Sequence, residues 1–424
     1  MIEIGSFIKL QRTKREMTQG QLAKGIVSLS YLSKIENKKT EASSEIIQLL
    51  CTRLGIQLKD GFDANIQKKC KEWYNMLFEV NDKEEIISTY KELQAVMDEN
   101  LTDSLLMFEI HKIRYYLIIG KYNEALTKIS DLNEMSGSFD NLHQYYWYKF
   151  RGNYNSANGD FEQAIILYKS AEERLNQIEV EEKEIADLQY IISITHSKLR
   201  NTLESIEYAE KALDIYMKEY YFMRCAQCHI VLGISYRRIK MYDKAIKNYN
   251  LARHLGELNK DKQVIQLTNL NLGYLHSARG GSKEAIHNYL EVVNDLEVDL
   301  NARLTSLTAL IKEYYTINNV EKTKQMIEKG FELFEQININ NNDTYRIHYY
   351  VLKTYNYAIN KSNSKFENLV INELIPYLKE HKDYANLVVY ANMLGNHFEE
   401  LSKYKDSVKY YKLANITYDE LVNL

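Results

Sequence analysis

Residues 232–252 read LGISYRRIKMYDKAIKNYNLA, and this stretch decides the fold of most of the chain. Apolar residues recur at helical spacing on both sides of its middle, at Leu232 and Tyr236 and again at Ala245 and Tyr249. The stretch therefore predicts two helices joined by a short turn, and the small Ala245 lets their backbones approach. Because one such pair leaves an apolar face uncovered, copies of it must stack to complete a core.

The same pattern returns along the chain with a period near 40 residues. In the other clear copies, the position equivalent to Ala245, here called the slot, carries a small or short side chain. These residues are Ala125, Ala164, Ser205, Ala285, Thr323 and Ser407. Weaker copies near Glu85 and Lys365 bring the expected number of units to nine. The pattern L-G-x-x-Y followed by A-x-x-x-Y-x-x-A resembles tetratricopeptide repeats, and this resemblance implies a right-handed superhelix with a concave inner wall.

A different pattern occupies the amino-terminal end, where residues 18–39 read TQGQLAKGIVSLSYLSKIENKK. Thr18 is suited to cap a first helix, Gly25 can take the left-handed backbone of a tight turn, and Ser28 can cap a second helix. The apolar residues expected to face inward on this second helix are Leu29, Leu32 and Ile35. The segment therefore predicts a helix-turn-helix, whose second helix enters the major groove of DNA in known complexes.

Charge supports a nucleic-acid partner for this segment. The whole chain has a net charge of −4, but residues 1–60 carry a balance of +4. A basic module on an acidic body is the asymmetry that phosphate binding requires. The outward positions of the second helix carry polar or cationic side chains, at Ser30, Tyr31, Lys34, Asn37 and Lys38. A small helical packing domain that docks another protein is the alternative.

Three short motifs make the segment similar to the Xre or Cro/CI-type helix-turn-helix. They are I-G-x-x-I-K-x-x-R from Ile4 to Arg12, T-Q-x-x-L-A from Thr18 to Ala23, and S-x-I-E from Ser33 to Glu36. The resemblance implies phosphate contacts for Thr18 and Gln19 and base reading for Ser28, Ser30, Tyr31 and Lys34. We expect a DNA-binding domain over 1–62 and a repeat domain over 63–424.

Composition limits the remaining possibilities. One proline in 424 residues, few alternating strand patterns and 35 tyrosines predict an all-α chain with tyrosine in many packing slots. Without an export signal or a long apolar run, we expect a cytoplasmic protein with no membrane contact. The segment CAQCH at 225–229 matches a haem-attachment pattern, but we expect both cysteines to pack within a repeat helix. No residues are grouped as a catalytic or metal site, so we predict no enzyme activity and no cofactor.

A helix-turn-helix followed by such repeats resembles the peptide-pheromone receptors grouped as Rap, Rgg, NprR, PlcR and PrgX, and the nine units are most like NprR. The resemblance implies a quorum-sensing transcription regulator in which a short signalling peptide, bound in the repeat groove, controls DNA binding. It also implies that asparagines after the inner-helix glycine hold the peptide backbone, here Asn153 and Asn396. The repeat register places the other expected groove residues at Arg114, Arg237, Asn271, Tyr274, Lys312, Tyr315, Tyr350 and Asn392.

The expected partners are therefore double-stranded DNA, a short peptide and further copies of the chain in a homodimer or tetramer. The first alternative is Rap-like binding of a phosphorelay response-regulator receiver domain, which also could be a second role of the peptide-free form. The second alternative is a plain scaffold with a vestigial helix-turn-helix. Solvated asparagine, lysine and arginine on any concave wall would account for single members of the groove set equally well.

Overall fold

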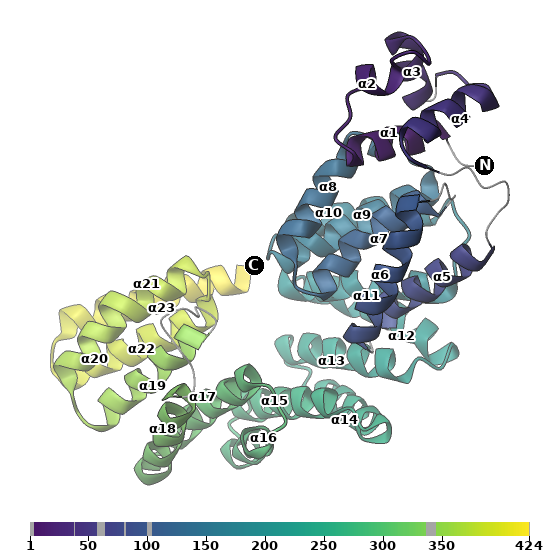
Figure 1. The fold of residues 1–424 in the computed structure, drawn as a ribbon. Coiled ribbons are helices and arrows are strands. Elements are labelled where there is room, and N and C mark those ends of the chain that lie inside the picture. The colour runs from purple at the N-terminus through teal and green to yellow at the C-terminus, as the bar shows by residue number, and fades with distance from the viewer. Residues whose placement is uncertain are drawn as a thin grey trace. The chain divides into compact units, whose positions relative to one another are not determined.

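A computed structural model describes residues 4–37, 39–56, 64–79, 82–99, 104–335 and 345–423. Within these ranges every regular element is helical, which confirms the all-α prediction (Figure 1). Contacts divide the chain into two compact units, Met1–Leu188 and Gln189–Leu424, and each is described by itself. The predicted domain boundary at residues 62 and 63 lies outside the described residues.

The first four helices form the helix-turn-helix module: α1 Ile4–Lys14, α2 Gln19–Ala23, α3 Leu29–Glu36 and α4 Ser44–Arg53. Their apolar sides meet in a small core in which Ile8, Leu22, Leu32 and Leu50 are fully buried. Leu29, expected to face inward, is instead 57% exposed. It is the first residue of α3, so it lies outside the stripe that Leu32 and the following turn bury.

Nine consecutive helix pairs follow within the described residues, as the sequence predicts. In the first unit they are α5 Ala64–Glu79 with α6 Lys83–Glu99, α7 Leu105–Ile118 with α8 Tyr122–Asn133, and α9 Asn141–Ala157 with α10 Phe161–Leu175. Next come α11 Glu182–Lys198 with α12 Thr202–Lys218, α13 Phe222–Arg238 with α14 Tyr242–Asn259, and α15 Lys262–Ala278 with α16 Ser282–Asn294. The last are α17 Leu300–Thr316 with α18 Val320–Glu335, α19 Arg346–Ile359 with α20 Asn363–Leu369, and α22 Tyr384–Glu400 with α23 Tyr404–Asn423.

The small residues at the repeating position of Ala245 are buried, as the repeat pattern predicts. Ala125, Ala164, Ser205, Ala245, Ala285 and Thr323 have no exposed surface, and Ser407 is 3% exposed. The eighth pair differs, because the buried position is Phe366 and the neighbouring Lys365 is exposed. Beyond α20 the chain passes through one π-helical segment, Val370–Leu374, into α21 Ile375–Glu380, so the larger Phe366 coincides with a less regular second helix.

Glycine and tyrosine set the distance between the two helices of four pairs. A Cβ added to Gly152 would lie 2.6 Å from Cδ1 of Tyr168, which stacks on the glycine from the second helix. The same contact joins Gly233 with Tyr249, Gly273 with Tyr289, and Gly395 with Tyr411. Only a residue without a side chain allows the ring to lie this close, so these tyrosines are packing residues, as the sequence predicts.

Candidate functional site

The caps of the helix-turn-helix form as the sequence predicts. The Thr18 hydroxyl accepts from the backbone N–H of Gln21 at 3.2 Å, and the Gln21 side chain accepts from the backbone N–H of Thr18 at 2.7 Å. Gly25 has a φ of +75°, and the Ser28 hydroxyl accepts from the backbone N–H of Tyr31 at 3.2 Å. Two short helices therefore meet at a fixed angle across a left-handed glycine.

The predicted DNA-contacting residues differ in how much surface they offer. Thr18, Ser28, Ser30, Lys34 and Asn37 are exposed, whereas Gln19 and Tyr31 are half-buried. Lys38 lies outside the described residues. Gln19 donates through Nε2 to Glu36 at 2.7 Å, and the Tyr31 hydroxyl donates to the Glu41 carbonyl at 3.3 Å. Gln19 and Tyr31 therefore also brace the module.

A buried ion pair holds α3 against α1. Arg12 donates to both carboxylate oxygens of Glu36, at 2.6 and 3.0 Å, and to the carbonyl oxygen of Met17 at 2.8 Å. The Glu36 side chain has no exposed surface. The sequence motifs include Arg12 and Glu36 but do not predict that they pair. Their pairing over 24 residues of chain shows that they orient the helix that presents Ser30 and Lys34 outward.

In the first unit, two predicted groove residues lie together. Arg114 of α7 and Asn153 of α9 line the same cavity, together with Tyr74, His111, Tyr146, Lys149, Phe150, Glu184 and Asp187. A wider cavity of about 680 Å³ lies next to the first one. The two cavities share Tyr74, His111 and Tyr146 as lining residues, and the wider one extends to the loop before α11. The inner sides of α5, α7, α9 and α11 therefore present a recessed surface with aromatic and charged walls.

Lys149 is a buried cation that was not among the residues predicted from the sequence. Its Nζ contacts the carboxylates of Glu184 at 2.6 Å and Asp187 at 2.9 Å. Burial alone lowers the pKa of Lys149, but the attraction of Asp187 and Glu184 is stronger and raises it above its usual value. The signal in the sequence is one lysine within the aromatic run YYWYKF at 145–150, and its partners follow 35 or more residues later.

Asn153 and Asn396 share a local arrangement that repeats the glycine–tyrosine contact. Tyr168, which stacks on Gly152, donates its hydroxyl to Oδ1 of Asn153 at 3.0 Å. The Tyr411 hydroxyl lies 2.5 Å from Oδ1 of Asn396 and 2.7 Å from Oε2 of Glu399, so these two acceptors share its one hydrogen. With Oδ1 engaged, each amide has its Nδ2 hydrogens left to donate, which suits a carbonyl oxygen of an extended peptide.

In the second unit, the predicted cations lie against aromatic rings. The Arg237 guanidinium carbon is 5.9 Å from the centre of the Tyr274 ring, and Lys312 Nζ is 5.4 Å from that of Tyr390. Lys312 also donates to Oδ1 of Asn386 at 3.0 Å. Burial lowers the pKa of Lys312 to about 8, although Asp383 acts in the opposite direction.

The remaining predicted groove residues lie in varied surroundings. Tyr315 meets Tyr355 edge to face, and Tyr350 meets Tyr377 in the same way. Asn392 is exposed, whereas Asn271 is 7% exposed and donates to the Leu267 carbonyl at 2.8 Å. Asn271 therefore offers little surface to a ligand in this conformation.

The haem-like segment packs within α13. Cys225 and Cys228 are buried thiols, and Nδ1 of His229 lies 2.8 Å from Oδ1 of Asn248. Among the described residues no group of three or more histidine, cysteine, aspartate or glutamate side chains could hold a metal ion. In the same ranges no helix has the length and apolar content needed to cross a membrane.

Comparison with known proteins bears on both modules. The family described as helix-turn-helix matches residues 8–60. The transcriptional activator NprA of Geobacillus stearothermophilus is 34% identical over 409 residues, which are 95% of this chain and 100% of that protein. Response regulator aspartate phosphatase I of Bacillus subtilis (strain 168) is 22% identical over 82% of this chain and 89% of that protein.

Solved structures show the same architecture. The apo form of the quorum sensor NprR from B. thuringiensis has a TM-score of 0.70 at 19% identity, over 83% of this chain and 98% of that one. A Rap protein complexed with Competence and Sporulation Factor has a TM-score of 0.67 at 20% identity, over 85% of this chain and 99% of that one. NprR in complex with its cognate peptide NprX has a TM-score of 0.60 at 20% identity, over 82% of this chain and 97% of that one.

An amino-terminal helix-turn-helix followed by nine helix pairs defines the class: a helix-turn-helix protein with a tetratricopeptide-like array. Identity of 34% over nearly the whole length is more specific than shared architecture. The chain belongs to the family of the transcriptional activator NprA.

Proposed function

We propose that this chain is a transcription regulator that binds double-stranded DNA through α2 and α3 and is controlled by a short signalling peptide on the inner wall of its repeats. The observation that carries the proposal is the two-sided character of α3. Its inner side is held by the buried Arg12–Glu36 pair, while Ser28, Ser30 and Lys34 are exposed. Short polar side chains on a fixed helix suit base edges in a major groove.

The peptide part of the proposal is supported by the repeats and by relatives. Asn153 in the first unit and Asn396 in the second each present amide hydrogens beside a stacked tyrosine. NprR, which shares the fold, has been solved in complex with its cognate peptide NprX. Backbone recognition by amides tolerates many peptide side chains, so specificity must come from neighbours such as Arg114, Tyr274 and Lys312.

Regulation then requires that peptide binding alters how the DNA-binding modules are presented. A homodimer or tetramer would place two modules on half-sites about 34 Å apart, one turn of DNA. A change in the packing of the repeats would change that spacing and hence operator affinity, without changing any base contact. In this proposal residues 1–62 are the DNA-binding domain and residues 63–424 are the peptide-binding domain.

Fluorescence anisotropy on duplex DNA at two salt concentrations tests DNA binding. Phosphate contacts release counterions, so affinity should fall steeply as salt rises, and Lys34→Ala should reduce the salt slope by about one unit. Lys283→Ala is the matched control, because it removes the same charge from an exposed position on α16. A flat salt response of the unmodified protein would favour the scaffold alternative.

Isothermal titration calorimetry tests the peptide site. The probes are synthetic peptides encoded by short secreted reading frames beside the gene. Asn153→Ala tests the first unit and Asn396→Ala the second, and each should weaken binding by about tenfold or more if its hydrogen bonds to the peptide are lost. Asn123→Ala on an exposed position of α8 is the control. Affinities unchanged by both groove variants would reject these residues as peptide ligands.

A second role is favoured by the relatives named response regulator aspartate phosphatases. We propose that the peptide-free form binds a response-regulator receiver domain and that this chain acts by binding rather than by catalysis. Copurification with a phosphorylated receiver domain tests the interaction. Loss of the receiver's phosphate at a rate that depends on this protein would instead show that it promotes dephosphorylation.

A further inference from the structure

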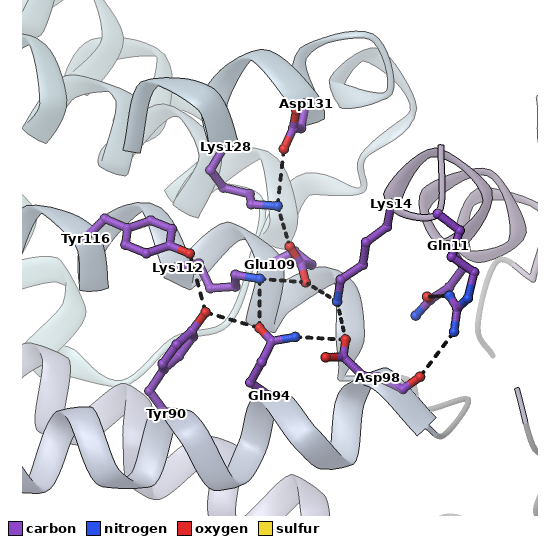
Figure 2. Close-up of polar contacts among 11 residues, drawn as sticks. Gln11, Lys14, Tyr90, Gln94, Asp98, Glu109, Lys112, Tyr116, Lys128 and Asp131 are labelled. Carbon is purple, nitrogen blue, oxygen red and sulfur yellow. Dashed lines mark hydrogen bonds and ion pairs between the residues drawn. The ribbon is translucent and has the colours of Figure 1, made fainter. Parts of the chain in front are cut away.

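A network of polar side chains joins the helix-turn-helix module to the first repeats (Figure 2). Lys14, the last residue of α1, donates to the Asp98 carboxylate on α6, and its Nζ lies 3.7 Å from Oε1 of Glu109 on α7. Arg15 donates to the Asp98 carbonyl oxygen at 3.3 Å. Lys14 and Arg15 therefore hold the end of α1 against Asp98, which lies 84 and 83 residues later in the sequence.

Glu109 is the buried centre of this network. Its side chain is 1% exposed and meets three lysines: Lys112 at 3.1 Å, Lys128 of α8 at 2.8 Å, and Lys14. Burial by itself raises the pKa of Glu109, but Lys112, Lys128 and Lys14 together lower it to about 2. The carboxylate is thus ionised at neutral pH, and one of the charges that stabilise it comes from a different module.

The receiving surface is ordered by its own hydrogen bonds. Lys112 donates to Oε1 of Gln94 at 2.9 Å, and Gln94 donates through Nε2 to Oδ1 of Asp98 at 2.8 Å. Tyr90 donates to the same Gln94 oxygen at 3.1 Å. Figure 2 shows these groups side by side across α6 and α7. Asp98 and Glu109 are therefore held in place by repeat residues, with Lys14 entering between them from α1.

The two ends of this network lead to the two proposed binding surfaces. On α1, Arg12 lies two residues before Lys14 and forms the buried pair with Glu36 of α3. On α7, His111 and Arg114 follow Glu109 and line the groove cavity of the first unit. A single cluster of buried apolar side chains also includes both modules, from Ile8 and Leu32 to Trp73 and Phe108.

We infer that Lys14, Asp98 and Glu109 form a latch that fixes the helix-turn-helix module on the repeats. This latch transmits movement of α7 to α3, the second helix of the helix-turn-helix. The regulatory part of this inference rests on the proposed function. A ligand that moves α7 from its groove side must carry Glu109 with it. Lys112 lies on the same helix and moves with Glu109, whereas Lys14 lies on α1, so α1 must follow or the contact between Lys14 and Glu109 must break. Either response changes the position of α3.

Spin-label distance measurements on the full chain test the latch without knowledge of the peptide or the operator. All four native cysteines are buried, so Gln48→Cys on α4 and Asn123→Cys on α8 provide two exposed labelling sites. With Lys14 present we expect a single narrow distance distribution. Lys14→Met should broaden it, and Lys14→Arg should restore it because the cation is retained.

Two further variants guard against a folding defect. Lys24→Met is the matched control, since it removes the same charge from an exposed position in the same module. Asp98→Asn weakens the latch from the repeat side at a carboxylate that is 45% exposed, so it leaves no buried charge unpaired at its own position. A narrow distribution in both Lys14→Met and Asp98→Asn, equal to that of Lys24→Met, would overturn the latch.

Anisotropy on a mixed-sequence duplex separates this inference from the proposed function. Lys14 faces the repeats, so Lys14→Met should keep the salt slope of the unmodified protein, whereas Lys34→Ala should lower it by about one unit. Absence of salt-dependent binding in the unmodified protein would reject the proposed function, and the label distances would still decide whether the latch exists. Salt-dependent binding with a narrow distribution in the latch variants would retain the proposed function and reject the latch.

Discussion

His111 should make the first repeats sensitive to mild acid. The side chain is 3% exposed, stacks on Tyr74 with ring centres 3.8 Å apart, and hydrogen-bonds through Nδ1 to the Met107 carbonyl at 2.9 Å. Burial lowers the pKa of His111 from 6.5 to about 3, and Lys149 acts in the same direction. The folded protein therefore holds this ring neutral under conditions in which the unfolded chain would protonate it.

The size of the effect follows from proton linkage. A group with a lowered folded pKa contributes stability above its unfolded pKa of 6.5, and this contribution is lost as the pH falls from there toward the folded value near 3. The loss is about 1.4 kcal/mol per pH unit once the pH is well below 6.5, so it should reach about 2 kcal/mol near pH 5. Glu109, with a pKa of about 2, adds little in this range because its unfolded value is 4.5.

Hydrogen exchange of α7 amides is the suitable assay, because the chain has two compact units and a single unfolding midpoint would combine them. After correction for intrinsic exchange rates, opening free energies of α7 should fall by about 2 kcal/mol between about pH 7.5 and about pH 5. His111→Phe keeps the stacked ring and should remove this dependence. His348→Gln, in the second unit, should leave it unchanged. An equal acid response of α7 with and without His111 would refute the reasoning.

Three further predictions concern stability. Gly233→Ala should destabilise the fifth pair by about 1–3 kcal/mol, because its Cβ would lie 2.8 Å from Cζ of Tyr249, and the amides of α13 and α14 should exchange faster. Gly159→Ala meets no neighbour within 4 Å but must keep a φ of +82°, so it should cost about 1 kcal/mol, measured by hydrogen exchange of α9 and α10 amides. Arg12→Met should destabilise the helix-turn-helix by about 3–5 kcal/mol by leaving Glu36 buried and unpaired. Faster exchange confined to α1–α4, with loss of DNA binding, would be its signature, and unchanged exchange there would contradict it.

The helix pairs were predictable because their determinants are local and periodic. Each slot residue recurs near 40 residues from the next, and burial of Ala125, Ala164, Ala245 and Ala285 confirms the register. The helix-turn-helix was predictable for the same reason, since the Thr18 and Ser28 caps act within three residues. Local hydrogen bonds and repeated spacing can be predicted from a single sequence.

The charged clusters were not predictable, because their members are distant in sequence. Glu109 meets Lys14 across 95 positions, and Lys149 meets Glu184 across 35. In the sequence, Lys149 is marked by its place in the aromatic run at 145–150. The left-handed turns after the inner helices were only partly predictable. Gly120, Gly159 and Gly280 mark three of them, but lysine has the same conformation at Lys240, where φ is +60°.

The glycine–tyrosine contacts limit how the array can respond to a ligand. A tyrosine ring stacked on a glycine backbone holds the two helices of a pair at one distance. Packed interiors resist such compression, so movement must occur between pairs rather than within them. Polar bridges from one pair to another, such as Lys149 to Asp187 and Lys312 to Asn386, then determine which pairs move together. The contacts of Lys14 with Asp98 and Glu109 are bridges of this kind that join the repeats to α1.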